Sequence, residues 1–167
     1  GMERTSIGQA RIETLSDGRI YIYGETEEDE KTVAFVTKYI DNGSTATEKW
    51  TQFLSNPEEN TNIEAIGIAA ASDGSIYVSG STGGNLDGQT NQGSGDIYVT
   101  KYIDNDNTAS KEWTKLFGTS EYDIPSSPTI STNGSIYIRQ ATITSTDDDG
   151  LRVESFLNKL SNDGTNV

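Results

Sequence analysis

Residues Gly95–Gly118, GDIYVTKYIDNDNTASKEWTKLFG, decide the fold of this chain. Two runs rich in Ile, Val, Tyr and Thr flank an acidic turn, and this pattern predicts two β-strands joined by that turn. A close copy, TVAFVTKYIDNGSTATEKWTQFL, covers Thr32–Leu54, and the letters VTKYIDN are identical at 36–42 and 99–105. A Trp follows in each copy. The chain is therefore built on an internal repeat.

A second repeated signal precedes each copy, consisting of two short apolar runs separated by a turn pair. The pairs are Asp17-Gly18, Asp73-Gly74 and Asn133-Gly134. Asp-Gly and Asn-Gly adopt the positive φ angles that tight hairpins need, so each pair predicts a β-hairpin. The third hairpin leads to a more distant copy, VESFLNKL at 153–160, and no Trp-bearing run follows it before Val167.

These signals divide 2–167 into three repeats of a single domain, at about 9–62, 63–123 and 124–167, while Gly1 is expected to be the remnant of a cleaved tag. Four strand-like runs per repeat are typical of propeller blades. Near-continuous Ile, Val and Tyr runs are typical of a sheet covered on both faces. The prediction is an all-β, propeller-like fold of about three four-stranded antiparallel blades, the last incomplete in chain order. A β-sandwich is the competing interpretation, but it does not explain the repeat.

Four stretches of the second repeat belong together: DGSIYVSGST at 73–82, GNLDG at 84–88, YVTKY at 98–102 and LFGT at 116–119. They resemble the bacterial SBBP repeats, a β-propeller family with extracellular and cell-surface members. The resemblance is good over 63–119, fair over 9–54 and weak over 120–160. It implies a propeller scaffold on or outside a bacterial cell, and it carries no catalytic signature.

Composition excludes several classes of partner and of chemistry. The net charge is −14, with 26 acidic against 12 basic residues, and a surface this acidic repels nucleic-acid backbones. There is no Cys, so no disulfide forms, and no His, so the commonest general base and transition-metal ligand is missing. No apolar run approaches the roughly 18 residues of a membrane-spanning helix, so membrane insertion is not expected.

The loop between the second and third runs of the second repeat, NLDGQTNQGSGD at 85–96, is the candidate metal site. Asp87, Asn91 and Asp96 offer oxygen ligands on a Gly-rich backbone, which suits a hard cation such as calcium. The spacing is not that of an EF-hand. An ordered turn held by side-chain hydrogen bonds to its own backbone explains the same residues.

Aromatic residues recur at fixed positions of the repeat. Tyr21, Tyr77 and Tyr137 each follow a hairpin turn, and Trp50 and Trp113 lie in the last run of the first two repeats. We expect both sets to pack between neighbouring sheets, because large aromatic rings dominate such interfaces. Sugar stacking is the alternative for the tyrosines.

Three blades in an open arc leave two sheet faces bare, whereas closed propellers usually have 4–8 blades. The chain is therefore expected to have neighbouring repeats in a longer protein, or to form a homodimer that completes a ring. Residues 2–8 are candidates for the strand missing from the third repeat.

The function expected from these observations is a non-catalytic extracellular or cell-surface interaction module that binds protein or glycan. One alternative is a structural repeat segment of a larger surface protein with no ligand of its own. Another is a calcium-assisted polysaccharide-active enzyme whose catalytic residues the sequence does not reveal.

Overall fold

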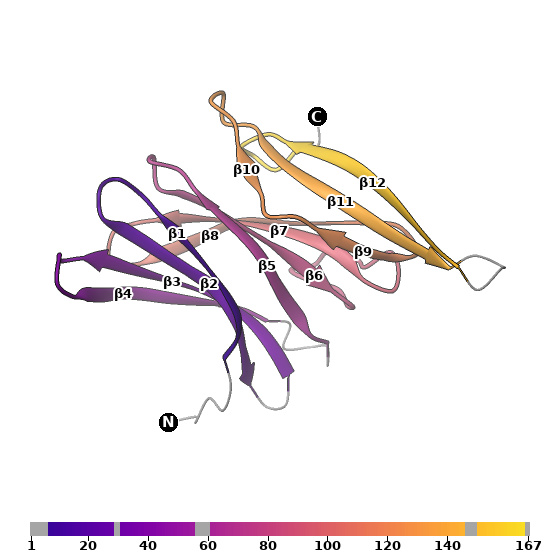
Figure 1. Cartoon of the computed structure of the whole chain (residues 1–167), viewed down its shortest axis with the longest axis horizontal. Helices are drawn as coiled ribbons and strands as arrows, with labels where there is room; N and C mark the ends of the chain where they lie inside the picture. The colour runs from indigo at the N-terminus through magenta and orange to yellow at the C-terminus, as the bar shows by residue number, and fades with distance from the viewer. Residues whose placement is uncertain (1–6, 29–30, 56–60, 146–149, 166–167) are drawn as a thin grey trace.

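The computed structural model describes residues 7–28, 31–55, 61–145 and 150–165, which form strands and turns without any helix. The strands make three antiparallel sheets that lie side by side in chain order (Figure 1). The first sheet contains β1 (Ile7–Thr14), β2 (Arg19–Glu28), β3 (Lys31–Asp41) and β4 (Ala46–Leu54). The predicted all-β class and the three four-stranded antiparallel sheets are thereby confirmed.

The second sheet repeats the strand order of the first. It contains β5 (Ile63–Ala70), β6 (Ser75–Thr82), β7 (Asp96–Asp104) and β8 (Ala109–Phe117). Both sheets have the simple up-and-down strand order that short hairpin turns produce. Gly18 and Gly74 turn the predicted hairpins at φ angles of 87° and 91°, which a side chain rarely tolerates.

The third sheet reaches four strands in a different way. It contains β9 (Tyr122–Pro125), β10 (Thr129–Ile130), β11 (Ile136–Ser145) and β12 (Leu151–Leu160). Both β9 and β10 pair with β11, so they are two halves of one interrupted inner strand. Pro125 ends the first half and Pro128 precedes the second, and proline cannot donate to a strand ladder.

As a result, no described strand pairs with the outer side of β12, where β4 and β8 lie in the other sheets. Residues 2–8 were the expected source of such a strand. Ile7 and Gly8 instead begin β1, and Ile7 pairs with Thr26 within the first sheet. Residues 2–6 lie outside the described residues.

The hydrophobic core lies between sheets. One cluster joins the first sheet to the second, and β5 packs against β1, β2 and β3. A second cluster joins the second sheet to the third through Tyr77, Ile97, Val99, Ile136, Ile138 and Leu160. Each pair of sheets therefore behaves as one packing unit, and a sheet without a neighbour leaves apolar residues uncovered.

Candidate interaction site

The first two sheets are held together by a polar cluster on Asp104, the residue that ends β7. The Tyr21 hydroxyl donates to Asp104 Oδ2 at 2.7 Å, Lys38 Nζ lies 2.8 Å from the same oxygen, and Trp50 Nε1 donates to Oδ1 at 3.1 Å. The side chains of Lys38 and Asp104 are only 2% and 3% exposed. We call such a cluster a clamp: the Tyr, Lys and Trp of one sheet and the turn residue of the next.

Hydrogen bonding decides the protonation of this clamp. Burial acts to raise the pKa of Asp104, but the hydrogen bonds from Lys38, Tyr21 and Trp50 outweigh it and hold the pKa below its usual value. Burial and the neighbouring carboxylate raise the pKa of Tyr21 well above its usual value. Asp104 is therefore a carboxylate and Tyr21 a neutral phenol at neutral pH.

A second clamp joins the second sheet to the third. The Tyr77 hydroxyl donates to Asn162 Oδ1 at 2.7 Å, Trp113 Nε1 donates to the Asn162 carbonyl at 3.1 Å, and Lys101 Nζ reaches the same carbonyl at 3.4 Å. The strand registers are equivalent, because Tyr21 pairs with Lys38 as Tyr77 pairs with Lys101. The aromatic rings also agree, since both Tyr–Trp pairs have centroids 6.1 Å apart.

The two clamps differ in charge. Asn162 offers a neutral amide where Asp104 offers a carboxylate, so the buried ammonium group of Lys101 has no carboxylate within the second clamp. A hollow of about 470 Å³ opens beside it, lined by Lys101, Glu112, Trp113, Ser161, Asn162 and Asp163. The second clamp is therefore the weaker and more open of the two.

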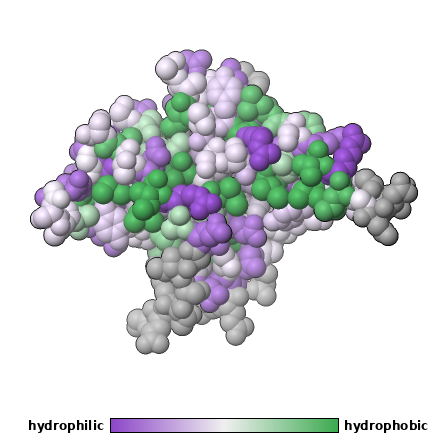
Figure 2. Space-filling view, viewed as in Figure 1, coloured by the Kyte–Doolittle hydropathy of each residue, from purple (hydrophilic) through white to green (hydrophobic). Residues whose placement is uncertain are grey.

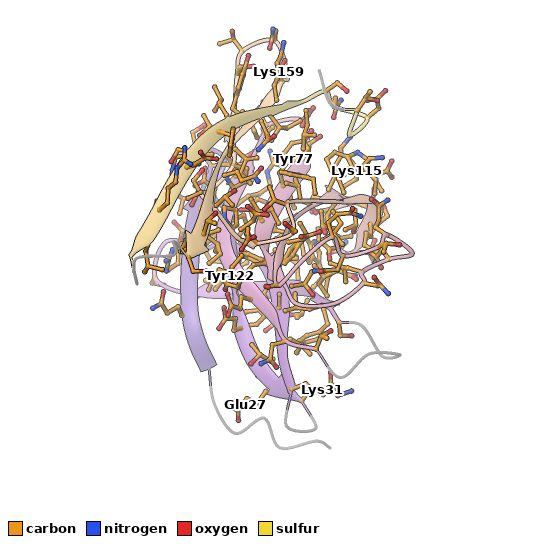
Figure 3. All side chains as sticks on the ribbon, turned by 90° about the vertical axis from the view of Figure 1, so that its right-hand side faces the viewer. Glu27, Lys31, Tyr77, Lys115, Tyr122 and Lys159 are labelled. Carbon is orange, nitrogen blue, oxygen red and sulfur yellow. The ribbon has the colours of Figure 1, made fainter. Side chains whose placement is uncertain are left out.

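The third sheet carries the donor half of a clamp without an acceptor. Tyr137 of β11 pairs with Lys159 of β12, in the register of the pairs Tyr21–Lys38 and Tyr77–Lys101. Both side chains are half-buried, and neither makes a hydrogen bond or ion pair within the described part of the chain. In Figure 3, Tyr77 of the second clamp is surrounded by other side chains, whereas Lys159 lies at the upper end of the third sheet.

The first sheet carries the matching acceptor half. Asp41 ends β3 as Asp104 ends β7, and the turn geometry is the same: Asp41 N donates to Gly18 O, and Asp104 N to Gly74 O, both at 2.9 Å. The exposed Asp41 carboxylate accepts one described hydrogen bond, from Gly43 N at 2.7 Å. No described Tyr, Lys or Trp of another sheet reaches it.

A further exposed feature is the outer edge of β12. Leu151, Val153 and Leu157 are largely exposed there, and they lie in the strand that lacks an outer neighbour. Hydrophobic surface reaches the third sheet beside the grey residues at the right of Figure 2. An edge strand with apolar side chains and unpaired backbone N–H and C=O groups can pair with a strand of another chain.

Each of the three predicted metal ligands has hydrogen-bond or ion-pair partners of its own in the structure. Asp87 lies 2.6 Å from Lys111 Nζ in an ion pair and also accepts a hydrogen bond from Thr114. Asp96 lies at the start of β7 and accepts a hydrogen bond from Gln92 N at 2.7 Å, so the two carboxylates have different partners. Loop residues close in sequence thus serve two different places.

Asn91 and Asp96 bond mainly to their own loop. Asn91 Nδ2 donates to Thr82 O at 2.9 Å, its Oδ1 accepts from Gly93 N at 2.9 Å, and Asp96 Oδ2 accepts from Gln92 N at 2.7 Å. These bonds match the alternative of a turn held by side-chain hydrogen bonds. Among the described residues no group of three or more acidic side chains could hold a metal ion, and calcium binding stays a prediction.

Sequence reasoning missed the partner of Asp96. Its carboxylate and that of Asp123 are fully buried on either side of Gly118, whose hypothetical Cβ would lie 2.5 Å from Asp96 Oδ1 and 2.7 Å from Asp123 Oδ2. Burial, with a contribution from Asp123, raises the pKa of Asp96. Asp123 belongs to β9 of the next sheet and stands outside any acidic motif, so no sequence signal pointed to it.

No protein-family model matches the chain, and no curated protein is similar to it at a significant level. The described residues also contain no helix long and apolar enough to cross a membrane.

Proposed function

We propose that this chain is a non-catalytic interaction module on a β-propeller scaffold, displayed on or outside a bacterial cell, that binds an extended segment of another protein along β12. The bare outer edge of β12 is the observation that carries the proposal. The propeller arrangement is supported by four-stranded sheets that pack in chain order. The location rests on the resemblance to SBBP repeats.

The other two sheets indicate which segment fits this edge. The strand next to β3 places Trp50 opposite Lys38, and the strand next to β7 places Trp113 opposite Lys101. At β12 the corresponding residue is Lys159, which has β11 on one side and no described strand on the other. A segment that carries a Trp at this position would complete the sheet in the same register.

The residue after the Trp has a preferred chemistry as well. Thr51 hydrogen-bonds across to Thr37 at 2.9 Å, and Thr114 hydrogen-bonds across to Thr100 at 3.0 Å. The equivalent residue of β12 is Asn158, which can pair with a hydroxyl. The ligand that fits best is therefore an extended strand containing Trp-Thr, bound through backbone hydrogen bonds and one aromatic anchor.

A synthetic peptide that copies Thr108–Gly118 tests this function. With an added fluorophore, it should bind the protein saturably in fluorescence polarisation, and hydrogen exchange should show new protection of amides within Leu151–Leu160. The same peptide carrying Thr114→Pro is the matched control, because proline cannot join the ladder. Absence of binding at millimolar peptide, equal binding of the control, or protection confined to other strands would each overturn the proposal.

A further inference from the structure

We propose that copies of this chain associate head to tail, with Tyr137 and Lys159 of one copy closing on Asp41 of the next. This interface uses the outer faces of the first and third sheets, whereas strand binding uses the backbone edge of β12, and Lys159 takes part in both. The partner is a second copy of the chain, because both halves of the missing clamp belong to this sequence.

The donor half is already arranged for this contact. In the two clamps within the chain, a Tyr hydroxyl and a Lys ammonium group from paired positions of neighbouring strands reach the same turn residue of the next sheet. Tyr137 and Lys159 hold the same paired positions in the third sheet. An ammonium group and a phenol at this spacing suit a carboxylate acceptor.

Asp41 supplies that carboxylate. It has the sequence context of Asp104, since both end the repeated segment YID, and its turn makes the same backbone hydrogen bond to the preceding hairpin. Where Asp104 is buried under three donors, Asp41 is exposed. Contact between Lys159 and Asp41 would therefore reproduce the ionic first clamp rather than the neutral second one.

The surface around Asp41 also fits a neighbouring sheet. In the second sheet, Ile68, Ile76 and Val78 share one face and are buried against the first sheet. Their counterparts in the first sheet are Ile12, Ile20 and Ile22, which the same register places on one face. Ile12 is 65% exposed, whereas Ile68 is 7% exposed, because no described sheet covers the first sheet on this side.

The opposite end of the chain offers the complementary apolar surface. Val99 of the second sheet is fully buried against the third sheet. Leu157 holds the equivalent position in the third sheet, two residues before Lys159 as Val99 is two before Lys101, and it is 71% exposed. Leu157 would meet the isoleucines of the next copy, as Val99 meets the third sheet.

Such a contact joins two different surfaces, so it closes only if the rotation between copies returns to the start. Two copies would bring six four-stranded sheets together, which lies within the usual range of 4–8 propeller blades. The net charge of −14 opposes association over distance, while the Lys159–Asp41 pair acts locally. At about 0.15 M salt the long-range repulsion is largely screened.

Charge exchange between the two half clamps tests the interface. Asp41→Lys alone places two lysines in contact and Lys159→Asp alone places two aspartates in contact, so each variant should associate at least tenfold more weakly than the parent chain. An equimolar mixture of the two variants restores the native Lys159–Asp41 pair at one contact. At the other contact the two substituted residues face each other, again with opposite charges. The mixture, and the double variant, should therefore regain association.

The measurement is the molar mass by light scattering on a sizing column at 0.15 M salt. We expect twice 18.1 kDa for the parent, the mixture and the double variant, and 18.1 kDa for each single variant. Lys49→Asp, which makes the same charge change as Lys159→Asp at an exposed site of β4, should behave as the parent.

Three results would overturn the inference: a parent chain that stays at 18.1 kDa at millimolar concentration, single variants that associate as the parent does, or a mixture that fails to regain association. The mixture also guards against misfolding, because a variant that cannot fold cannot be rescued by its partner. Hydrogen exchange of the β12 amides tests peptide binding, whereas molar mass tests association between copies. One proposal can therefore fail while the other holds.

Discussion

At the scale of single residues, the difference between Asp104 and Asn162 separates two otherwise equivalent clamps. Both residues accept a Tyr hydroxyl at 2.7 Å, but only Asp104 neutralises the buried Lys opposite it. A buried ammonium group without a carboxylate costs free energy that good hydrogen-bond geometry recovers only in part. The first interface is therefore ionic and tight, and the second is neutral and partly open.

Asp104→Asn should lower the free energy of unfolding by about 2–4 kcal/mol, because it removes the buried carboxylate beside Lys38 and leaves only the exposed carboxylate of Asp106, 3.4 Å away, as a charge partner. The variant should also change the acid response. The pKa of Asp104 is lowered in the folded state, so its stabilisation is present above the unfolded value of about 3.9 and is lost as the pH falls through the folded value.

Urea unfolding of both proteins between pH 3 and pH 7 measures this response. The parent should lose stability below about pH 4 more steeply than the variant, because only the parent must protonate Asp104. Parallel curves at acid pH would contradict the assignment of Asp104 as the buried charge of the clamp.

The converse change, Asn162→Asp, should stabilise the second interface by about 1 kcal/mol, since Lys101 would gain a charged acceptor. The stabilisation should vanish when Lys101→Met is added, because the new carboxylate then has no partner. The free energy of unfolding of the two single variants and the double variant measures the coupling, and a coupling near zero would contradict the proposed role of Lys101.

At the scale of elements, the hairpins were predictable because their signal is local. Asp-Gly and Asn-Gly pairs set the turn geometry by themselves, and the structure places positive φ angles at Gly18, Gly74 and Gly134. The interruption between β9 and β10 was not predicted, and the predicted repeat boundary at 123/124 falls within β9. Proline leaves the ladder there, and its effect depends on which side of the strand faces β11.

The clamps were not predictable in the same way. Tyr21 and Trp50 lie 83 and 54 residues from Asp104, and they meet it only because one sheet packs on the next. A signal was nevertheless present, since Tyr, Lys, Trp and Asp recur at matching positions of both copies. The predicted metal ligands were chosen by proximity in sequence, which does not reveal that Asp87 pairs with Lys111 while Asp96 bonds to Gln92.

The unpaired edge of β12 predicts a characteristic exchange pattern. In β7, which has a neighbour on both sides, amides along the whole strand should be protected. In β12, alternate amides should exchange rapidly because their N–H groups face solvent, while those that bond to β11 stay protected. Hydrogen exchange followed by NMR measures this pattern, and uniform protection of Leu151–Leu160 in the monomer would contradict a free edge.

At the scale of the whole molecule, stability should decrease from the first interface to the second. The chain has two tryptophans, and each reports on one interface: Trp50 on the first clamp and Trp113 on the second. In sheets that contact only their neighbours, the end unit with the weaker interface opens first. The third sheet combines a neutral clamp with a missing outer strand, so it should be that unit.

Two single-tryptophan variants test this order. Trp113→Phe leaves the signal of Trp50, and Trp50→Phe leaves that of Trp113. We expect the fluorescence of Trp113 to change at a lower urea concentration than that of Trp50. The midpoint of each fluorescence transition is first referred to the midpoint by far-UV circular dichroism of the same variant. Coincident transitions in both variants would mean that the three sheets unfold together.

The clamps also give the molecule a direction. Every donor set points toward the next sheet along the chain and every turn acceptor points back, so one end of the molecule presents Asp41 and the other presents Lys159. Like ends repel, so the charges that favour an ordered series disfavour a symmetric face-to-face pair. Molecules anchored by one end would all present the opposite end outward. An array of them would therefore display either Asp41 of every molecule or Lys159 of every molecule at its exposed surface.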